Sequence, residues 1–275
     1  MQVLAPAKIN LSLRILGRRD DGLHEIETFI APVSLYDEVT IEKEGKGINF
    51  QCDDPSVPTG EKNLVVRAAN VFFGATKLQP AMTIKLKKRI PHGAGLGGGS
   101  SDAAATLLAL NRVFETNLTR EDLVRLASGI GSDVPFFLFE SCALCRGRGE
   151  IVTRANLPEH LSILLLKPDF GVETPWAYSR WQASREIRGV NYSGQEFGGH
   201  RFINDLERPV FEKFVSLAQV KTWLLKQPEV GAALMSGSGS TMFAVLRNAQ
   251  AADALRDRAR KELDPELWTC ACETL

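Results

Sequence analysis

The sequence has no excess of charge of either sign and no long apolar run. Its 275 residues include 33 Lys plus Arg and 33 Asp plus Glu, and no apolar run approaches the roughly 20 residues that a membrane-spanning helix needs. Such a balance is not typical of nucleic-acid or membrane-surface binding proteins. A strand pattern begins by Val3, which leaves no room for a signal peptide. We therefore expect a cytoplasmic protein without a nucleic-acid or membrane partner, and no protein partner is indicated.

Cysteine is scarce, and the residues present form an odd set: Cys52, Cys142, Cys145, Cys270 and Cys272. The two closely spaced pairs could be combined into a four-thiolate zinc site. The last pair, however, shares one face of an alternating C-terminal strand pattern with Trp268, where a reduced cysteine acts as a small hydrophobic residue. The pattern therefore favours reduced cysteines, and we assign no metal site to them.

Glycine, in contrast, is concentrated in one stretch over 90–105, which reads IPHGAGLGGGSSDAAA. An alternating strand pattern over 82–87 precedes it and an apolar helical pattern over 103–114 follows it. Ser100 or Ser101 is predicted to cap the helix. Because glycine has no Cβ, the backbone can approach a bulky anion, and the helix N-terminus adds free N–H groups. This order of strand, glycine loop and helix predicts a phosphate-binding loop.

Two common phosphate-loop signatures do not account for this stretch. Gly93, Gly95 and Gly98 match the dinucleotide-binding fingerprint, but that fingerprint requires a second parallel strand after the helix, ending in an acidic residue. Here a second helical pattern follows instead, capped by Thr119 with Asp122 three residues later. The P-loop pattern also fails, because no lysine follows the glycines. The loop therefore indicates another class of phosphate-binding protein.

Three further polar residues have no catalytic role that periodicity alone can assign. Residues 5–15 alternate strictly and place Lys8 and Asn10 on the same face of a strand, for which a solvated face is the ordinary interpretation. Asp133 precedes Pro135, and Ser132 or Asp133 could cap the turn that this proline starts. Spacing by itself therefore favours structural roles for all three side chains.

The length and the remaining patterns indicate one large domain or two modest ones. The expected elements include strands over 29–33, 38–42, 161–166 and 241–246 and helices over 209–216, 218–226 and 252–263. Asn63 is predicted to cap an earlier helix. The polar, glycine-rich segment 184–200 is the best candidate for a mobile loop, and a second glycine loop, SGSGS, covers 236–240. We expect a domain boundary near 155–160.

Three separated motifs occur together in this chain, namely APAKINL at 5–11, PHGAGLGGGSSDAAA at 91–105 and SGSGS at 236–240. In combination they resemble the GHMP family of small-molecule kinases. Four further segments agree with that family, and they lie at 18–24, 131–135, 147–150 and 204–207. The resemblance implies an α+β fold of two domains, with an N-terminal domain like domain 2 of ribosomal protein S5 over 1–154 and a ferredoxin-like C-terminal domain over 155–275.

The resemblance also implies an activity. Members of this family transfer the γ-phosphoryl group of ATP to a hydroxyl group of a small molecule, and Mg²⁺ is expected to accompany ATP. The match is closest to the branch that acts on the 2-hydroxyl of a cytidyl diphosphate substrate in the non-mevalonate isoprenoid pathway. Homoserine or mevalonate kinases would share the glycine loops but not the segments 18–24 and 147–150, and a non-catalytic descendant would lack Lys8 or Asp133.

The family pattern assigns roles residue by residue. It implies that Asp133 is the general base beside the acceptor hydroxyl, with Lys8 close to both, in place of the structural roles that spacing favours. The implied ATP-binding loop comprises Pro91, His92, Gly93, Ala94, Gly95, Leu96, Gly97, Gly98, Gly99, Ser100 and Ser101. The implied substrate-binding residues are Asn10, His24, Arg148, Thr174, Tyr178, Gly237, Ser238 and Gly239. Ser100 and Ser101 are candidate ligands of Mg²⁺, and no protein ligand is assigned to it.

One position departs from the family pattern. In the family a tyrosine usually precedes the histidine and stacks on one face of cytosine, whereas here Leu23 precedes His24. A leucine can pack on a base but offers no aromatic ring. We therefore expect Tyr178 to provide most of the stacking on the base.

Overall fold

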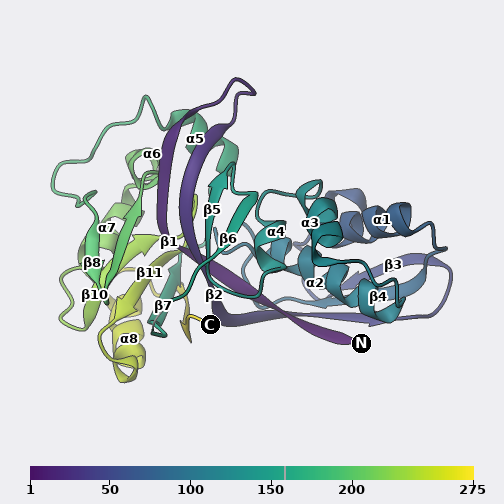
Figure 1. The fold of residues 1–275 in the computed structure, drawn as a ribbon. Helices are drawn as coiled ribbons and strands as arrows, with labels where there is room; N and C mark the ends of the chain where they lie inside the picture. Colours follow the sequence, from purple (N-terminus) through teal and green to yellow (C-terminus); the bar gives the residue numbers. More distant parts are fainter. Residues whose placement is uncertain (158) are drawn as a thin grey trace.

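The computed structural model describes residues 1–157 and 159–275, and it contains two β-sheets with helices packed against them (Figure 1). The N-terminal part of the chain supplies most of the first sheet and the four helices that pack on it, whereas the second sheet is built from strands that begin at Ser162 or later. Within the described ranges no helix is long and apolar enough to cross a membrane.

The first sheet has eight strands and is organised around its two longest, β1 and β2. Its hydrogen-bonded order is β3-β4-β2-β1-β9-β8, and β5 pairs with both β2 and β6. The strands are β1 (Gln2–Arg18), β2 (His24–Glu42), β3 (Gly47–Cys52), β4 (Ala81–Lys87), β5 (Ala143–Gly147), β6 (Ile151–Arg154), β8 (Gln195–Phe197) and β9 (His200–Asn204). Helices α1 (Leu64–Thr76), α2 (Gly98–Val113), α3 (Arg120–Ser128) and α4 (Val134–Phe137) share an apolar core with it.

The second sheet has four antiparallel strands and is buried on both faces. Its order is β10-β11-β7-β12, from β7 (Ser162–Lys167), β10 (Val230–Met235), β11 (Met242–Leu246) and β12 (Trp268–Glu273). Leu164 and Leu166 of β7 pack in a core with α5 (Thr174–Arg180), α6 (Glu207–Lys213), α7 (Val215–Leu224) and α8 (Ala252–Glu262). Ile163 and Leu165 point to the other side, into the cluster between the two sheets. This double burial explains the continuous apolar run in the sequence.

The long strand β1 links the two sheets. Ala7, Ile9 and Leu11 pack in the cluster that also contains residues of β7, β10 and β11. Because side chains alternate along a strand, Lys8 and Asn10 point to the opposite side. The packing of β1 on the second sheet therefore determines the direction in which these two polar side chains face.

The prediction of two separate strands near 29–33 and 38–42 was wrong, because β2 is one strand of 19 residues. Its register with β1 shifts between two consecutive pairs, Pro6 with Tyr36 and Ala7 with Val33. A bulge of this kind interrupts the alternation of buried and exposed side chains without ending the strand. The sequence pattern consequently breaks where the backbone continues.

Two of the predicted helix caps are confirmed. Asn63 accepts a hydrogen bond from the backbone N–H of Val65 at 2.8 Å and begins α1. Thr119 and Asp122 form the reciprocal capping box of α3. The helices predicted at 209–216, 218–226 and 252–263 correspond to α6, α7 and α8, and the strands at 161–166 and 241–246 to β7 and β11.

Two other caps were wrong. Helix α2 begins at Gly98 and its N-cap is Gly97, with φ of 70° and no side-chain cap, so Ser100 and Ser101 lie inside the first turn. Asp133 stands at the N-cap position of α4 but makes no capping hydrogen bond. In both cases the side chain that local sequence assigns to a cap is left available for other contacts.

The segment 184–200 contains β8 and the first residue of β9, which form a short hairpin, and β9 pairs in parallel with β1 at Ser12 and Leu13. Residues beyond 155 therefore complete the first sheet. The domain boundary at 154/155 and the mobility of 184–200 stay predictions. All five cysteines are free, and Cys270 and Cys272 pack on the cluster between the sheets, as the alternation of the last strand predicts.

Candidate active site

A cleft of about 830 Å³ lies where the three sequence motifs meet. Its borders include Lys8 and Asn10 of β1, the glycine loop over 91–100, and Gly237 and Ser238 between β10 and β11. The other family-implied residues that line it are His24, Asp133, Arg148, Thr174 and Tyr178. The volume is in the range of small-molecule sites, about 300–1,000 Å³. The two implied residues that do not line the cleft are Ser101 and Gly239.

The first glycine loop is anchored on its underside by apolar side chains. Ala94 and Leu96 are buried in the cluster between the two sheets. The glycines that alternate with them, Gly93, Gly95 and Gly97, have φ values of 63°, 76° and 70°. Side chains with a Cβ rarely adopt such positive φ values, which explains the glycines. The loop thus presents backbone rather than side chains to the cleft, next to the N-terminus of α2, and this arrangement suits an anionic ligand.

The two glycine loops, separated by about half of the chain, are in direct contact. The hydroxyl of Ser236 donates a hydrogen bond to the carbonyl oxygen of Gly95 at 2.9 Å, and the N–H of Thr241 donates to the carbonyl oxygen of Ala94 at 3.2 Å. A Cβ on Gly95 would lie 2.2 Å from the carbonyl oxygen of Ser236. Gly95 is therefore required for the close approach that joins the two sides of the cleft.

Lys8 and Asn10 are buried, with exposed fractions of 4% and 3%, so the solvated face that periodicity favours was wrong. A Cβ on Gly237 would lie 3.2 Å from both Lys8 Nζ and Asn10 Oδ1, and a Cβ on Gly97 would lie 2.9 Å from Lys8 Cγ. Because glycines of both loops lie against this face of β1, the loops can cover Lys8 and Asn10 closely. The polar face of β1 is consequently the floor of the cleft.

The polar groups on this floor form a connected set. Lys8 Nζ donates to Asn10 Oδ1 at 2.5 Å, and Asn10 Nδ2 donates to Thr28 Oγ1 at 2.8 Å. Lys8 Nζ also lies 3.7 Å from Asp133 Oδ2. Burial lowers the pKa of Lys8, and the charge of Asp133 opposes that effect. The Asp133 side chain is 39% exposed, so a cation at the floor meets a carboxylate that is open to the cleft.

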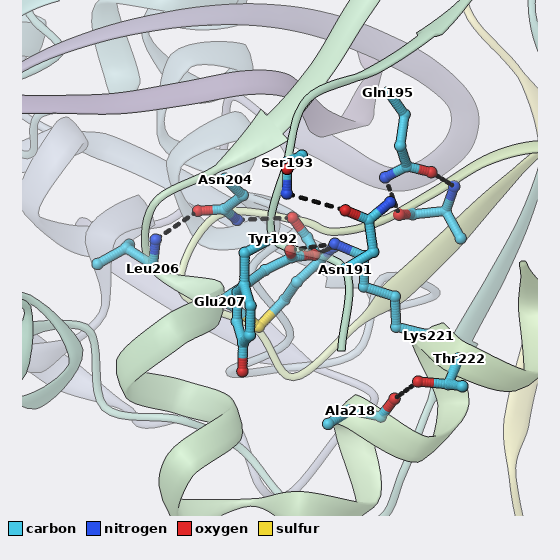
Figure 2. Close-up of polar contacts among 12 residues, drawn as sticks. Asn191, Tyr192, Ser193, Gln195, Asn204, Leu206, Glu207, Ala218, Lys221 and Thr222 are labelled. Carbon is cyan, nitrogen blue, oxygen red and sulfur yellow. Dashed lines mark hydrogen bonds and ion pairs between the residues drawn. The ribbon is translucent and has the colours of Figure 1, made fainter. Parts of the chain in front are cut away.

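The second glycine loop is held from behind by a buried polar network (Figure 2). Asn204 Nδ2 donates to the carbonyl oxygens of Met235 at 2.7 Å and Gly237 at 2.8 Å. Glu207 Oε1 accepts from the N–H of Met235 at 2.9 Å, and its other oxygen pairs with the buried Lys221. The sequence shows 204–207 only as a family-like segment, and the structure shows that it supports the backbone at Gly237.

Aromatic side chains line one end of the cleft. The rings of His24 and Tyr178 lie 5.4 Å apart at 32°, and Trp181 packs edge-on against His24 at 6.0 Å. Burial, and secondarily Arg18, lowers the pKa of His24. Leu23 lines the same end and is 44% exposed, so it does not pack into the core. This end of the cleft offers one phenol ring and one aliphatic side chain to a flat ligand.

Hydrogen bonds hold three of the remaining implied substrate residues, Arg148, Thr174 and Ser238. The backbone N–H of Arg148 donates to Glu150 Oε2 at 2.7 Å, in the turn between β5 and β6. Thr174 Oγ1 and Ser238 Oγ form a hydrogen bond at 2.7 Å, which joins the start of α5 to the second glycine loop. The cleft therefore has fixed walls contributed by both sheets.

The sequence analysis missed a buried ionic cluster at the glycine-loop end of the cleft. Lys88 Nζ pairs with Asp37 and lies 2.9 Å from Asp102 Oδ2. Asp37 also accepts from the N–H groups of Arg89 and Ile90, at 2.5 and 2.8 Å. Burial raises the pKa of Asp102 to about 8. The cluster fixes the chain just before the loop, and no local pattern in the sequence indicates that its three members meet.

Two family models match this chain. The model of the GHMP kinases N terminal domain matches residues 63–141, and that of the GHMP kinases C terminal domain matches residues 193–264. The crystal structure of a homoserine kinase from Cytophaga hutchinsonii covers 100% of this chain and 94% of its own, with a TM-score of 0.71 and 19% identity, and thus shares the fold. The fold and the two matches define an ATP-dependent small-molecule kinase of the GHMP class.

Other relatives are similar over the whole chain. The 4-diphosphocytidyl-2-C-methyl-D-erythritol kinase of Methylacidiphilum infernorum is 42% identical over 98% of this chain and 96% of its own. The crystal structure of a 4-(cytidine 5'-diphospho)-2C-methyl-D-erythritol kinase, 36% identical, covers 100% of this chain and 99% of its own with a TM-score of 0.81. The chain belongs to the 4-diphosphocytidyl-2-C-methyl-D-erythritol kinase family.

Proposed function

We propose that this protein transfers the γ-phosphoryl group of ATP to the 2-hydroxyl of 4-diphosphocytidyl-2-C-methyl-D-erythritol and yields the 2-phosphate, in the methylerythritol phosphate route to isoprenoid precursors. One observation carries the proposal. Lys8 and Asp133 meet in a cleft that is bordered on one side by the glycine loop and on the other by His24 and Tyr178. The full-length similarity to kinases named for this substrate supports the choice of acceptor.

In this proposal the loop over 91–100 binds the triphosphate of ATP. Phosphoryl transfer needs mainly positioning and the stabilisation of charge on the transferred group. Backbone N–H groups of the loop and the N-terminus of α2 would replace the water around the phosphates. The hydrogen bond from Ser236 to Gly95 would bring the second glycine loop against the same ligand.

Asp133 is the proposed general base. Its carboxylate accepts the proton of the acceptor hydroxyl, the oxygen attacks the γ-phosphorus, and the bond to the leaving ADP breaks. Lys8, which is held by Asn10 at the floor, offsets the negative charge that grows on the acceptor oxygen. Because Lys8 is buried and hydrogen-bonded, its charge is already positioned before the reaction begins.

The cytidyl end of the substrate is proposed to lie at the aromatic end of the cleft. Tyr178 would stack on the base, His24 would contact its polar edge, and Leu23 would pack on the other face. Arg148 would face the diphosphate. Asn10 on the floor, Thr174 at the start of α5, and Gly237 and Ser238 of the second glycine loop would complete the substrate side, whereas Gly239, which does not line the cleft, would act by shaping the loop.

We propose that Mg²⁺ accompanies ATP, where it would supply neutralisation of the negative charge on the phosphates. Magnesium prefers oxygen ligands, and of the two candidate serines only Ser100 borders the cleft, so its hydroxyl is the protein oxygen that fits. Ser101 faces elsewhere and is not proposed as a ligand. A reaction that consumes ATP in this way is expected to take place in the cytoplasm.

ADP release under identical conditions tests the proposed function. The acceptors compared are 4-diphosphocytidyl-2-C-methyl-D-erythritol, homoserine, mevalonate and none. We expect substantial ADP release only with the cytidyl acceptor, and a phosphorylated product that mass spectrometry identifies. Faster turnover of homoserine or mevalonate would show that the protein acts on another class of substrate. Equal rates with and without an acceptor would contradict a small-molecule kinase role.

A further inference from the structure

The tip of the second glycine loop is a tight turn of a defined type. The N–H of Gly239 donates to the carbonyl oxygen of Ser236 at 2.9 Å, and this bond closes a β-turn with Gly237 and Ser238 as its central residues. Gly237 has a φ of 56°, whereas Ser238 does not belong to the described residues that have a positive φ. A positive φ at the first central residue alone is the pattern of a type II′ turn. The turn type therefore defines the orientation of the peptide group between Gly237 and Ser238.

Asn204 binds this peptide group from behind (Figure 2). Its Nδ2 donates to the carbonyl oxygen of Gly237 at 2.8 Å and to that of Met235 at 2.7 Å. Its Oδ1 accepts from the N–H of Leu206 at 2.9 Å, which requires an oxygen at that end of the amide. The NH₂ end of the amide must consequently face the two carbonyl groups. Because Asn204 is only 4% exposed and all these bonds are made within the protein, its side chain is fixed in this orientation.

The other end of the same peptide group points toward the cleft. The C=O and N–H bonds of a trans peptide point in opposite directions. Because the carbonyl group of Gly237 points at the buried Asn204, the N–H of Ser238 points away from it, to the side on which both turn residues line the cleft. Within the described parts of the chain, this N–H has no hydrogen-bond acceptor. The turn thus presents a free donor to a ligand in the cleft.

This donor lies beside the proposed point of phosphoryl transfer. A Cβ on Gly237 would lie 3.2 Å from Lys8 Nζ and 3.4 Å from the carbonyl oxygen of Gly95. The turn is therefore placed between the lysine that faces the acceptor oxygen and the loop proposed to bind the triphosphate. The phosphoryl group in transfer carries its negative charge on its oxygens, and an N–H aimed at such charge stabilises the transition state.

The position of Asn204 is set by the strand that carries Lys8. Asn204 pairs with Leu13 of β1 in the parallel ladder, and the N–H of Asp205 donates to the carbonyl oxygen of Leu13 at 2.9 Å. Lys8 lies on the same strand, at the floor of the cleft. Asn204 therefore fixes the turn relative to the strand from which the proposed catalytic lysine projects.

We propose that Asn204 is a positioning residue for phosphoryl transfer, an inference that rests on the proposed function. By holding the carbonyl group of Gly237, it keeps the N–H of Ser238 aimed at an oxygen of the γ-phosphoryl group. A flip of this peptide would give a type I′ turn and would present a carbonyl oxygen to the phosphate instead. The flip would also leave the buried amide of Asn204 without one of its acceptors, which is costly. Asn204 thus excludes the turn conformation that would repel the transferred group.

Binding of nucleotides to the full chain tests the contact directly. The backbone amide of Ser238 is followed by heteronuclear NMR and by its rate of hydrogen exchange, in the presence of Mg²⁺ with either ADP or a non-hydrolysable ATP analogue. We expect a downfield shift of this amide proton and slower exchange with the ATP analogue only, because ADP has no γ-phosphoryl group. Both nucleotides should shift the amides of Gly97 and Gly98, which report that the first loop is occupied.

Asn204→Leu and Gln195→Leu form a matched pair of variants. Gln195 also binds the backbone of β10 through its side-chain amide, because it donates to the carbonyl oxygen of Ala233 at 2.9 Å and accepts from the N–H of Ala233 at 3.0 Å. It contacts the strand rather than the turn, and it does not line the cleft (Figure 2). Both variants should lose stability in urea unfolding. Only Asn204→Leu should lose the response of the Ser238 amide to the ATP analogue.

Kinetics separate positioning from structural support. In Asn204→Leu, kcat for ADP release should fall about 10²-fold, the lower end of the roughly 10²–10³-fold loss that follows removal of one oxyanion donor. The Kd of the ATP analogue should rise at most about fivefold, the equivalent of one ordinary hydrogen bond. Gln195→Leu should keep the kcat of the wild type. The NMR comparison of ADP with the ATP analogue uses the wild type, so it decides the contact even if Asn204→Leu does not fold.

Three results would overturn the proposal. A shift at Gly97 and Gly98 without any response of Ser238 would show that its N–H does not contact the γ-phosphoryl group. An equal shift of the Ser238 amide with the cytidyl substrate alone would assign this donor to the diphosphate of the substrate. Equal losses of kcat in Asn204→Leu and Gln195→Leu would reduce Asn204 to a structural role. Failure of the proposed function gives a different result, namely an intact response of Ser238 without ADP release that depends on the cytidyl acceptor.

Discussion

Replacing Gly97 with alanine would add a single methyl group where the phosphate loop crosses the proposed catalytic lysine. The new Cβ would lie 2.9 Å from Lys8 Cγ, 3.2 Å from Lys8 Cε and 3.0 Å from Phe137 Cζ. Contacts this short require a neighbour to move. Phe137 packs in the apolar core, whereas Lys8 borders the open cleft, so Lys8 is the neighbour that gives way, and its ammonium group moves relative to Asp133.

The structure allows two separate costs to be estimated. The residue must also keep a φ of 70°, which costs an alanine roughly 1–2 kcal/mol. Lys8 Nζ lies 3.7 Å from Asp133 Oδ2, and a misplacement of about 1 Å in such a pair can lower turnover on the order of 10²-fold. We therefore expect Gly97→Ala to lose about 1–2 kcal/mol of unfolding free energy and roughly 10- to 100-fold in kcat.

Gly93→Ala is the matched control. Gly93 has nearly the same φ, 63°, but a Cβ there would meet no atom within 4 Å. Both variants should thus share the cost of the positive φ in urea unfolding, with any further loss in Gly97→Ala due to its close contacts, while only Gly97→Ala should show the large fall in kcat for ADP release. Equal kcat values in the two alanine variants would refute the argument that Gly97 is needed for the placement of Lys8.

Asp133→Asn should lower kcat about 10²–10⁴-fold with little change in urea stability, because it removes a proton acceptor and no capping bond; near-normal turnover would exclude the base role. Lys8→Met should likewise reduce kcat while the calorimetric Kd for ATP changes modestly. A loss of ATP affinity as large as the loss of kcat would assign Lys8 to nucleotide binding. Tyr178→Ala should raise KM for the cytidyl substrate by about 5- to 150-fold, from roughly 1–3 kcal/mol of base stacking, and Leu23→Tyr should lower it; an unchanged KM in Tyr178→Ala would place the base elsewhere. Burial raises the pKa of Asp102 to about 8, so the folded state keeps a proton that the unfolded state loses above roughly pH 4, and stability should fall as pH rises through this window by up to about 1.4 kcal/mol per unit. Asp102→Asn mimics the neutral acid and should flatten that part of the urea-unfolding profile, whereas an unaltered slope would show that Asp102 does not titrate there.

Local signals in the chain were sufficient for several elements of the fold. The strand, glycine loop and helix over 82–114, the capping box of Thr119 and Asp122, and the alternation of the last strand all depend on residues a few positions apart. Backbone geometry and side-chain period act over that distance, so the sequence alone determines them. The same local signals favoured Ser100 or Ser101 as the cap of α2, whereas Gly97, a residue type that can also cap a helix, takes this position with a positive φ.

The tertiary structure alone decided which polar residues are buried. Lys8 and Asn10 alternate like residues on a solvated strand, and only the approach of Gly97 and Gly237 from remote parts of the chain covers them. In the same way, Lys88, which directly follows β4, pairs with Asp37 of β2 and Asp102 of α2. Burial and charge pairing depend on which distant segments meet, and side-chain period carries no information about that. Family motifs pointed to Lys8 and Asp133, but the reason they can act together lies in the packing of β1 against the second sheet.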